Sequence, residues 1–168
     1  KKVGNNVLVI GKTEGHLDQS IFAKEILNEK KGPPPEINLF NEKNNGETVL
    51  KLIKEKLIES CHDVSLGGIL IALSKMCIKG KKGIKINPLK SLINKFEYFF
   101  SEDQGRYIIE VNNDNIKNVY KILKDNSVHF DELGIVNDNL VEFDEELNLS
   151  VEILNEENKT WLNNYMIN

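Results

Sequence analysis

Long apolar runs are missing from this 168-residue sequence. None approaches the roughly 20 consecutive apolar residues that a membrane-spanning helix needs, and no signal-peptide pattern opens the chain. A basic excess is missing too, because the formal net charge is −4 at pH 7, and nucleic-acid binders usually present a basic face. We therefore expect a cytoplasmic protein that has neither a membrane nor a nucleic acid as its partner.

Cysteine is equally scarce, with only Cys61 and Cys77 in the chain. A predicted helix separates them, so they do not suggest a disulfide framework, and reduced thiols are the simpler interpretation. A zinc site needs about four ligands, whereas His16, His62 and His129 are scattered. Neighbours on an extended segment point to opposite sides, so Cys61 and His62 are poorly placed as a catalytic pair. His62 alone is either a general acid–base or a hydrogen-bonded structural histidine.

The composition is that of a protein that can bury a core, with 40% hydrophobic and 29% charged residues. The length suits one compact domain over residues 1–168, with a helical tail over residues 150–168. Because the first residue is lysine and not methionine, we expect a piece of a longer protein. Strand and helix patterns mix without a regular βαβ rhythm, which predicts an α+β fold with helices packed on a mixed sheet.

Short β-branched runs predict strands, and apolar residues at helical spacing predict helices. The expected strands cover residues 5–11, 83–87, the end of 101–111, and a hairpin over 130–143 that turns at Asn-Asp-Asn. The expected helices cover residues 46–60, 67–79, 113–126 and a short stretch within 88–100. Three consecutive prolines predict an extended crossing over residues 30–40, and Asp18 or Ser20 is expected to cap the helix that begins near Ile21.

The segment HDVSLGG, residues 62–68, has the features of a helix start that binds an anion. Ser65 can cap the helix, and Gly67 and Gly68 let a ligand approach the backbone. The free N–H groups and the helix dipole there favour phosphate, and Asp63 can hold a magnesium ion that bridges to it. The alternative is that Asp63 and Ser65 only cap, while the glycines allow close helix packing.

Two further polar segments are candidate sites. In SEDQGR, Glu102 and Asp103 can bind a metal or a hydroxyl, Gln104 can donate and accept, and Arg106 can grip a carboxylate or phosphate. The alternative is a polar turn with a structural salt bridge. In LVIGKTEGHLDQS, residues 8–20, a strand, a glycine-containing loop and a helix have the general shape of a phosphate cradle. This segment matches neither the P-loop nor the dinucleotide fingerprint.

In their order along the chain, these motifs resemble one family over residues 7–166. The segments VLVIGKTEGHLDQS, KGPPPEINL, CHDVSLGGILIALSKM, FSEDQGRYIIEV and LGIV are similar to the last domain of phosphoribosylformylglycinamidine synthase. The resemblance is to the synthetase subunit of bacteria with a separate glutaminase, and to its C-terminal second B domain. This domain has the fold of the C-terminal domain of aminoimidazole ribonucleotide synthetase.

The resemblance implies an ATP-driven ligase of de novo purine biosynthesis. In that reaction ATP phosphorylates the amide oxygen of formylglycinamide ribonucleotide, and ammonia displaces the phosphate to give the formylglycinamidine. ATP and Mg²⁺ would serve the whole enzyme. The implied partners are the upstream A and B domains of the same chain, a glutaminase subunit and a small accessory subunit. The chain alone is then expected to be inactive. The alternative is a stand-alone, non-catalytic module of the same fold that binds a nucleotide or phosphate, or acts as a scaffold.

The resemblance also assigns roles to single residues. It implies Asp63 as a magnesium ligand. Contacts with substrate or phosphate are implied for a set of motif residues: Ser65, Gly67, Gly68, Glu102, Asp103, Gln104 and Arg106. In the second B domain these motifs face a pseudo-symmetric pocket, which is either catalytic or an auxiliary structural nucleotide site. Leu66 stands where the family pattern has a second aspartate, and Asp18-Gln19-Ser20 replaces the usual glycine-containing triplet.

Overall fold

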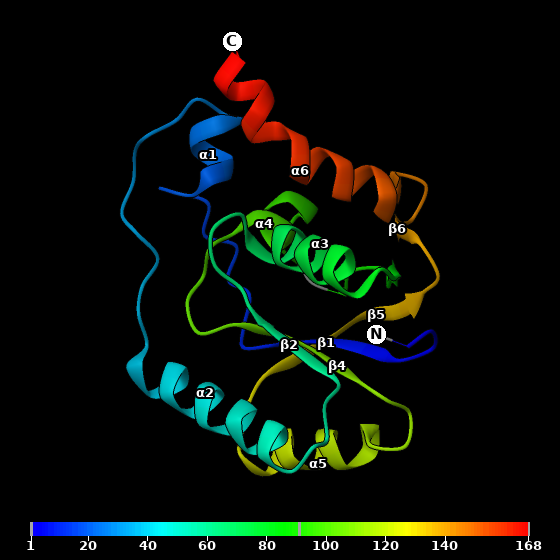
Figure 1. Ribbon diagram of the computed structural model, residues 1–168. Helices are drawn as coiled ribbons and strands as arrows, with labels where there is room; N and C mark the ends of the chain where they lie inside the picture. The colour runs from blue at the N-terminus through cyan, green and yellow to red at the C-terminus, as the bar shows by residue number, and fades with distance from the viewer. Residues whose placement is uncertain (1, 91, 168) are drawn as a thin grey trace.

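The computed structural model describes residues 2–90 and 92–167 (Figure 1). Lys1, Ser91 and Asn168, which fall within the predicted domain, the predicted short helix and the predicted tail, lie outside the described residues. Over the described ranges the strands form one sheet in the order β2-β4-β1-β5-β3-β6-β7. Their bounds are β1 (Asn6–Ile10), β2 (Ser60–Asp63), β3 (Gly83–Ile86), β4 (Tyr107–Val111), β5 (Phe130–Asn137), β6 (Leu140–Phe143) and β7 (Leu147–Ser150).

Helices cover both faces of this sheet, so the fold has three layers (Figure 1). The helix bounds are α1 (Ile21–Glu25), α2 (Leu39–Lys54), α3 (Gly68–Gly80), α4 (Lys95–Phe100), α5 (Ile116–Asp125) and α6 (Val151–Ile167). α3, α4 and α6 lie on one face, while α2 and α5 lie on the other (Figure 1). No helix within the described ranges is long and apolar enough to cross a membrane.

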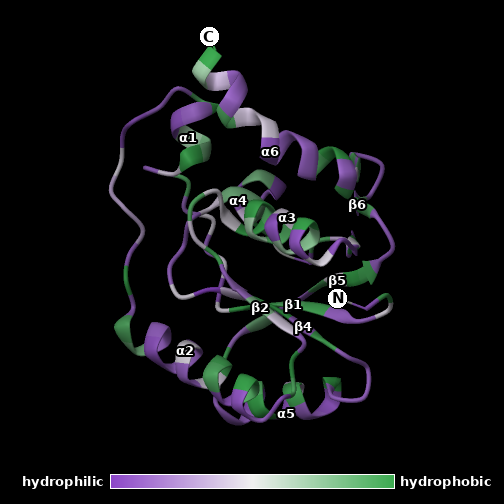
Figure 2. Ribbon diagram, in the orientation of Figure 1, coloured by the Kyte–Doolittle hydropathy of each residue, from purple (hydrophilic) through white to green (hydrophobic). Residues whose placement is uncertain are grey.

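The central strand β1 explains why the core has two halves. Val7 and Val9 belong to the apolar cluster beneath α3, whereas Leu8 and Ile10 belong to the cluster beneath α2 and α5. All four side chains are fully buried, because successive strand residues point to opposite faces of a sheet. Figure 2 shows apolar strands between helices that carry both apolar and polar residues. Each such side chain contributes about 1.5–3 kcal/mol by burial.

The predicted α+β class is confirmed, since the sheet is mixed. β3 and β6 pair in parallel, and the other paired strands are antiparallel. The predicted helix over 67–79 is present as α3. Ser20 caps α1, because its Oγ accepts a hydrogen bond from the Ala23 N–H at 3.1 Å. The proline segment runs as an extended crossing from α1 to the start of α2 (Figure 1).

The predicted hairpin over 130–143 is wrong. β5 and β6 follow each other in sequence, yet β3 lies between them, antiparallel to β5 and parallel to β6. Gly83 permits this insertion, because a Cβ at that position would lie 2.1 Å from the Leu140 carbonyl oxygen. A turn signal predicts a change of direction but carries no information about which strand becomes the neighbour.

Other boundaries also differ from the predictions. α2 begins at Leu39 and not near residue 46, because Asn38 caps it through an Oδ1 bond to the Asn41 N–H at 3.0 Å. It ends at Lys54. Its residues Leu50 and Ile53 are exposed, whereas Val49 and Leu52 are buried. Strands β2 and β7 were not predicted. The tail is a single helix, α6, and Trp161 on it is 56% exposed.

Candidate functional site

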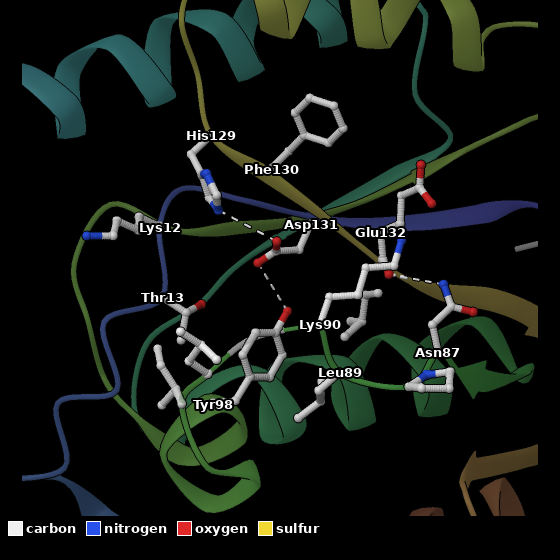
Figure 3. Close-up of a pocket in the computed structure, with 14 residues that line it drawn as sticks. Lys12, Thr13, Asn87, Leu89, Lys90, Tyr98, His129, Phe130, Asp131 and Glu132 are labelled. Carbon is white, nitrogen blue, oxygen red and sulfur yellow. Dashed lines mark hydrogen bonds and ion pairs between the residues drawn. The ribbon is translucent and has the colours of Figure 1, made fainter.

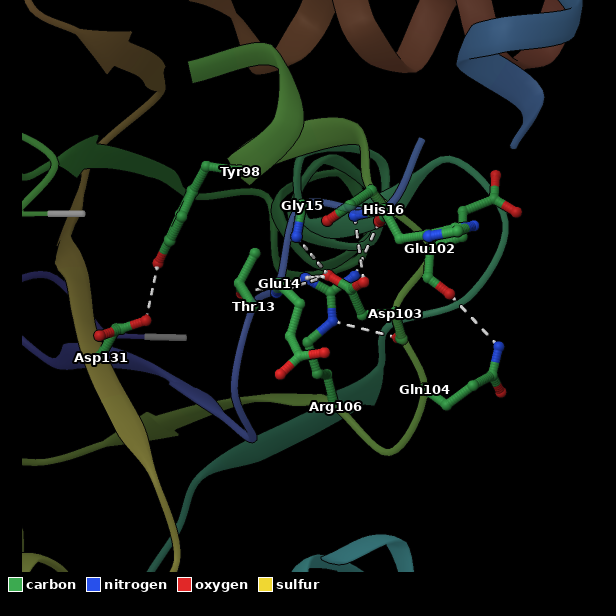
Figure 4. Close-up of polar contacts among 11 residues, drawn as sticks. Thr13, Glu14, Gly15, His16, Tyr98, Glu102, Asp103, Gln104, Arg106 and Asp131 are labelled. Atoms are coloured by element: carbon green, nitrogen blue, oxygen red, sulfur yellow. Dashed lines mark hydrogen bonds and ion pairs between the residues drawn. The ribbon is translucent and has the colours of Figure 1, made fainter. Parts of the chain in front are cut away.

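The three polar segments of the sequence meet at one place in the fold. β2 pairs with β4 so that Asp63 lies opposite Tyr107, and beyond them the Val64 N–H donates to the Arg106 carbonyl at 2.9 Å. The Glu102 N–H donates to the His16 carbonyl at 3.3 Å. This pairing places the loop after β1, the start of α3 and the segment SEDQGR in direct contact (Figure 4).

Glu102 occupies the helix start at which a phosphate was expected. Its Oε1 accepts hydrogen bonds from the Gly67 N–H and the Ile21 N–H, both at 2.8 Å. The first N–H groups of a helix have no partner within the helix and favour an anion. Here the chain supplies that anion itself, so the Gly67 N–H is engaged before any ligand arrives.

The glycine pair serves close packing in this structure. Gly68 has φ +71°, and a Cβ there would lie 2.6 Å from the carbonyl oxygens of Phe99 and Ser101. Gly67 is the N-cap residue of α3 with φ +85°, and as a glycine it has no side chain that could cap the helix. The predicted cap by Ser65 is therefore wrong; Ser65 takes part through its carbonyl, which accepts from the Gly68 N–H at 3.0 Å.

Asp103 turns into the loop after β1. Its Oδ2 accepts from the N–H groups of Glu14 and Gly15 at 2.9 and 3.1 Å, and its Oδ1 accepts from the His16 N–H at 3.2 Å (Figure 4). Only 6% of Asp103 is exposed. Hydrogen bonds to a charged acceptor are about twice as strong as neutral ones. Asp103 is therefore the group that fixes the path of residues 14–16.

Arg106 is buried beneath this loop, with 1% exposure. Its guanidinium donates to the Asp103 carbonyl at 3.1 Å, to Thr13 Oγ1 at 3.1 Å and to the Ser101 carbonyl at 2.7 Å. Nη1 also lies 3.7 Å from Asp103 Oδ2. Burial lowers the pKa of Arg106, and the charge of Asp103 opposes this shift. The N–H donors of Arg106 thus point into the protein. This arrangement agrees with the alternative interpretation of SEDQGR as a polar turn with a structural salt bridge.

Among the described residues, the side chains of His62 and Asp63 on β2 form no hydrogen bond or ion pair with Asp103 or Arg106, and the two residues bond to each other instead. His62 Nδ1 lies 2.6 Å from the Asp63 carbonyl oxygen and 3.5 Å from its Oδ1, and the Asp63 side chain is 67% exposed. Burial of its thiol raises the pKa of Cys61 to about 11, which removes the thiolate that a nucleophile needs. No group of three His, Cys, Asp or Glu side chains that could hold a metal occurs among the described residues. A lone carboxylate such as Asp63 suits Mg²⁺ only where phosphates supply further ligands.

A cavity of about 1120 Å³ opens between the proline segment and the loop after β1. Asp103 and Gln104 line it, whereas His62, Asp63, Ser65, Gly67 and Gly68 do not. The Gln104 side chain is exposed, and its only hydrogen bond within the described chain is a long one, 3.3 Å, from Nε2 to the Glu102 carbonyl. Of the predicted site residues, Gln104 is therefore the one with polar atoms free to meet a ligand in this cavity.

A second cavity has a volume of about 560 Å³ (Figure 3). Its polar wall comes from the start of β5 and from α4: the Tyr98 hydroxyl lies 3.3 Å from Asp131 Oδ2, and His129 Nε2 lies 3.6 Å from Asp131 Oδ1. Burial and the Asp131 charge raise the pKa of Tyr98. Lys12 and His129 line both cavities. This cluster could not be predicted from the sequence, because no spacing rule links Lys12, Tyr98 and Asp131.

Comparison with known families and proteins gives consistent results. Residues 2–144 match the family described as AIR synthase related protein, C-terminal domain. The chain is 64% identical over 168 residues to the phosphoribosylformylglycinamidine synthase subunit PurL of Pelagibacter ubique (strain HTCC1062), covering 100% of this chain and 23% of that protein. It is 34% identical over 165 residues to the subunit of the same name from Bartonella bacilliformis, covering 98% of this chain and 22% of that protein.

Solved structures share the fold. The structure of Thermotoga maritima PurL complexed with FGAR superimposes with a TM-score of 0.74 at 21% identity, over 92% of this chain and 28% of that one. The chain thus spans about a quarter of the length of the curated relatives that it matches. The fold and the resemblance noted from the motifs are confirmed, while the roles of single site residues stay predictions.

Proposed function

The chain belongs to the family described as AIR synthase related protein, C-terminal domain. On that premise we propose that it is the last domain of a phosphoribosylformylglycinamidine synthase subunit. The observation that carries this proposal is the 64% identity that extends over the whole chain to a subunit of that name. The proposed reaction converts formylglycinamide ribonucleotide, ATP and ammonia into the formylglycinamidine ribonucleotide, ADP and phosphate.

The larger cavity is the proposed contribution of this domain to ligand binding. Gln104 presents an exposed amide there that can both donate and accept, which suits the hydroxyl and amide groups of a ribonucleotide. Asp103, Glu102 and Arg106 act behind it, because their polar atoms bind the protein backbone. They are positioning residues in this proposal, and they hold the cavity wall in place.

The ATP-dependent step is proposed to occur on parts of the protein beyond this chain. ATP supplies the phosphoryl group that makes the amide oxygen a leaving group, and Mg²⁺ would accompany the nucleotide phosphates. Asp63 offers one exposed carboxylate at the end of β2, which fits one ligand of such an ion. Leu66, 65% exposed beside Gly67, supplies no second carboxylate there.

The proposed partners follow from the same premise. They are the A and B domains upstream in the same chain, a glutaminase subunit that supplies ammonia, and a small accessory subunit, all in the cytoplasm. A solved structure with the same fold is described as the structure of PurLQS from Thermotoga maritima, which supports an assembly of several subunits. The isolated chain is then expected to form no formylglycinamidine from ATP, ammonia and formylglycinamide ribonucleotide.

A domain exchange tests the proposal. The matching segment of the Pelagibacter ubique subunit is replaced by this chain, and product formation is measured with ammonia as the nitrogen source. We expect the exchanged subunit to keep activity, and the subunit with that segment deleted to lose it. A folded but inactive exchange, or turnover by the isolated chain, would contradict the proposal.

A further inference from the structure

The C-terminal helix α6 changes character halfway along its length. In its first half, Val151 is buried and Leu154 packs against the apolar cluster beneath α3. In its second half, every residue from Trp161 to Ile167 is exposed. Figure 1 shows α6 running past α3 toward the C-terminus. The second half of the helix therefore takes no part in the core that the described residues form.

The apolar stripe of α6 nevertheless continues into the exposed half. Trp161 and Tyr165 follow Leu154 after about two and three helical turns, and residues at these spacings share one face of a helix. Their rings lie 6.5 Å apart between centroids. Leu162 and Met166 lie beside them, and we call these four residues the tail stripe: Trp161, Leu162, Tyr165 and Met166. Their exposed fractions are 56%, 51%, 73% and 75%.

The exposed half of α6 also has few of the charges that a solvent-facing helix carries. Residues 151–157 include the glutamates Glu152, Glu156 and Glu157, whereas residues 158–167 include no carboxylate and the single cation Lys159. A helix on a protein surface usually has charged residues opposite its apolar face. The core of a protein interface is instead depleted of charge and rich in Trp, Tyr and Met. The second half of α6 therefore has the composition of a helix that another surface covers.

The tail stripe lies outside the family domain but within the similarity to the curated relatives. Residues 2–144 match the family domain, so the fold is defined without α6. The similarity to the Pelagibacter ubique subunit extends over all 168 residues and so includes the tail stripe. About three-quarters of that subunit lies outside the matched segment. The surface that covers the stripe can therefore belong to the same polypeptide.

The area of the stripe favours this occupant over a second copy of the chain. Complete burial of a Trp or Tyr removes about 150–250 Å² from water, so Trp161 and Tyr165 at their present exposure offer roughly 250 Å². A stable interface between separate chains buries about 800 Å² per partner, which is more than the whole tail stripe provides. A surface of the same polypeptide acts at a millimolar effective concentration, so a small apolar contact is sufficient.

We propose that the tail stripe docks into an apolar groove on the upstream domains of the same subunit and holds this domain against them. The inference rests on the proposed function, because it takes the chain to be the last domain of that subunit. The groove receives Trp161 and Tyr165 at an apolar centre. Its rim is uncharged or weakly acidic, because Lys159 is the only charged residue beside the stripe in residues 158–167. Docking then fixes the larger cavity relative to the upstream domains.

Hydrogen exchange of residues 158–167 tests the proposal in two proteins, the 168-residue chain and the exchanged Pelagibacter ubique subunit. We expect these backbone N–H groups to exchange about tenfold more slowly in the exchanged subunit, because docking protects the helix from opening. A double variant, Trp161→Gln with Tyr165→Gln, should abolish this protection and lower the melting temperature of the exchanged subunit. Glutamine is a good helix former, and both side chains are exposed in the 168-residue chain. The melting temperature of that chain should therefore stay unchanged.

Leu50→Gln is the matched control for the double variant. Leu50 is 54% exposed and lies on α2, which packs on the opposite face of the sheet. This variant should keep the protection of residues 158–167 in the exchanged subunit. Circular dichroism checks that each variant is folded.

Any of three results would overturn the proposal. Equal exchange of residues 158–167 in the two proteins would show that nothing in the subunit covers the stripe. An equal loss of melting temperature in both proteins would show that the stripe serves the fold of this domain. Sedimentation of the 168-residue chain as a dimer, which the double variant dissociates, would assign the stripe to a second copy.

Activity of the exchanged subunit is scored separately from protection of the tail. An active exchange with an unprotected tail rejects the docking alone. An inactive exchange with a protected tail rejects the proposed function alone.

Discussion

Neutralising Asp103 is the sharpest perturbation of the cluster that joins the three loops. Asp103→Asn keeps the size of the side chain but removes the charge that faces Arg106 at 3.7 Å. It also replaces one acceptor oxygen by an NH₂ group, which then points at backbone N–H donors of residues 14–16. Both partners are at least nine-tenths buried, so water cannot compensate for the loss.

The magnitude follows from the contacts. Removing one partner of a buried ion pair costs about 3–5 kcal/mol, and an asparagine oxygen can still accept from part of the loop. We therefore expect the free energy of unfolding to fall by about 3 kcal/mol. For a chain of this length, 1 kcal/mol corresponds to about 2–4 °C, which predicts a melting temperature lower by about 6–12 °C.

Urea unfolding followed by circular dichroism measures this effect directly. Glu14→Gln is the matched control, since Glu14 lies in the same loop but its side chain is 61% exposed in a surface ion pair. The control should change the free energy of unfolding by less than about 1 kcal/mol. If Asp103→Asn were as stable as the control, Asp103 would not be the group that fixes this loop.

Three other predictions concern the same region. Gly68→Ala should lower the free energy of unfolding in urea by about 3 kcal/mol, because φ is +71° and the new Cβ meets two carbonyl oxygens at 2.6 Å. Gly4→Ala, with φ +88° and open space around it, should lower it by only about 1 kcal/mol. Equal losses in the two variants would refute the packing role of Gly68. Glu102→Gln should speed hydrogen exchange at the backbone N–H groups of Ile21 and Gly67, which donate hydrogen bonds to the Glu102 carboxylate. Unchanged exchange would show that other groups protect these two N–H groups. Because its pKa is raised to about 11, Cys61 should react with iodoacetamide at pH 8 more slowly than free cysteine, and faster as pH rises toward 11; a rate equal to that of free cysteine would contradict the shift.

Local signals in the sequence predicted much of the fold correctly. The periodicity of α3 and the β-branched run of β1 are properties of single segments, so the α+β class could be inferred from them. The neighbour of β5 could not, because β3 enters between β5 and β6 through contacts that no turn signal encodes. The start of α2 was missed because Asn38, its cap, follows the proline segment, and the apolar pair Leu39 and Phe40 is followed by a polar run without helical apolar spacing.

The candidate site shows the same division. The motifs indicated three polar segments, and the fold brings them together because β4 pairs with both β1 and β2. The direction in which each side chain points was not predictable, because the residue type alone does not say whether a carboxylate binds a ligand or an unpaired backbone N–H. Glu102 and Asp103 bind the backbone. Lys12 and His129 line the same two cavities because β1 pairs with β5, which lies far away in the sequence.

The most direct measurement of the central claim, that the larger cavity meets the ligand, uses the exchanged Pelagibacter ubique subunit with Gln104→Ala. Steady-state kinetics with formylglycinamide ribonucleotide as the varied substrate separate binding from turnover. We expect a KM about tenfold higher, with kcat and melting temperature unchanged, because Gln104 is exposed and its one side-chain hydrogen bond within the described residues is long. An unchanged KM in an active enzyme would contradict it.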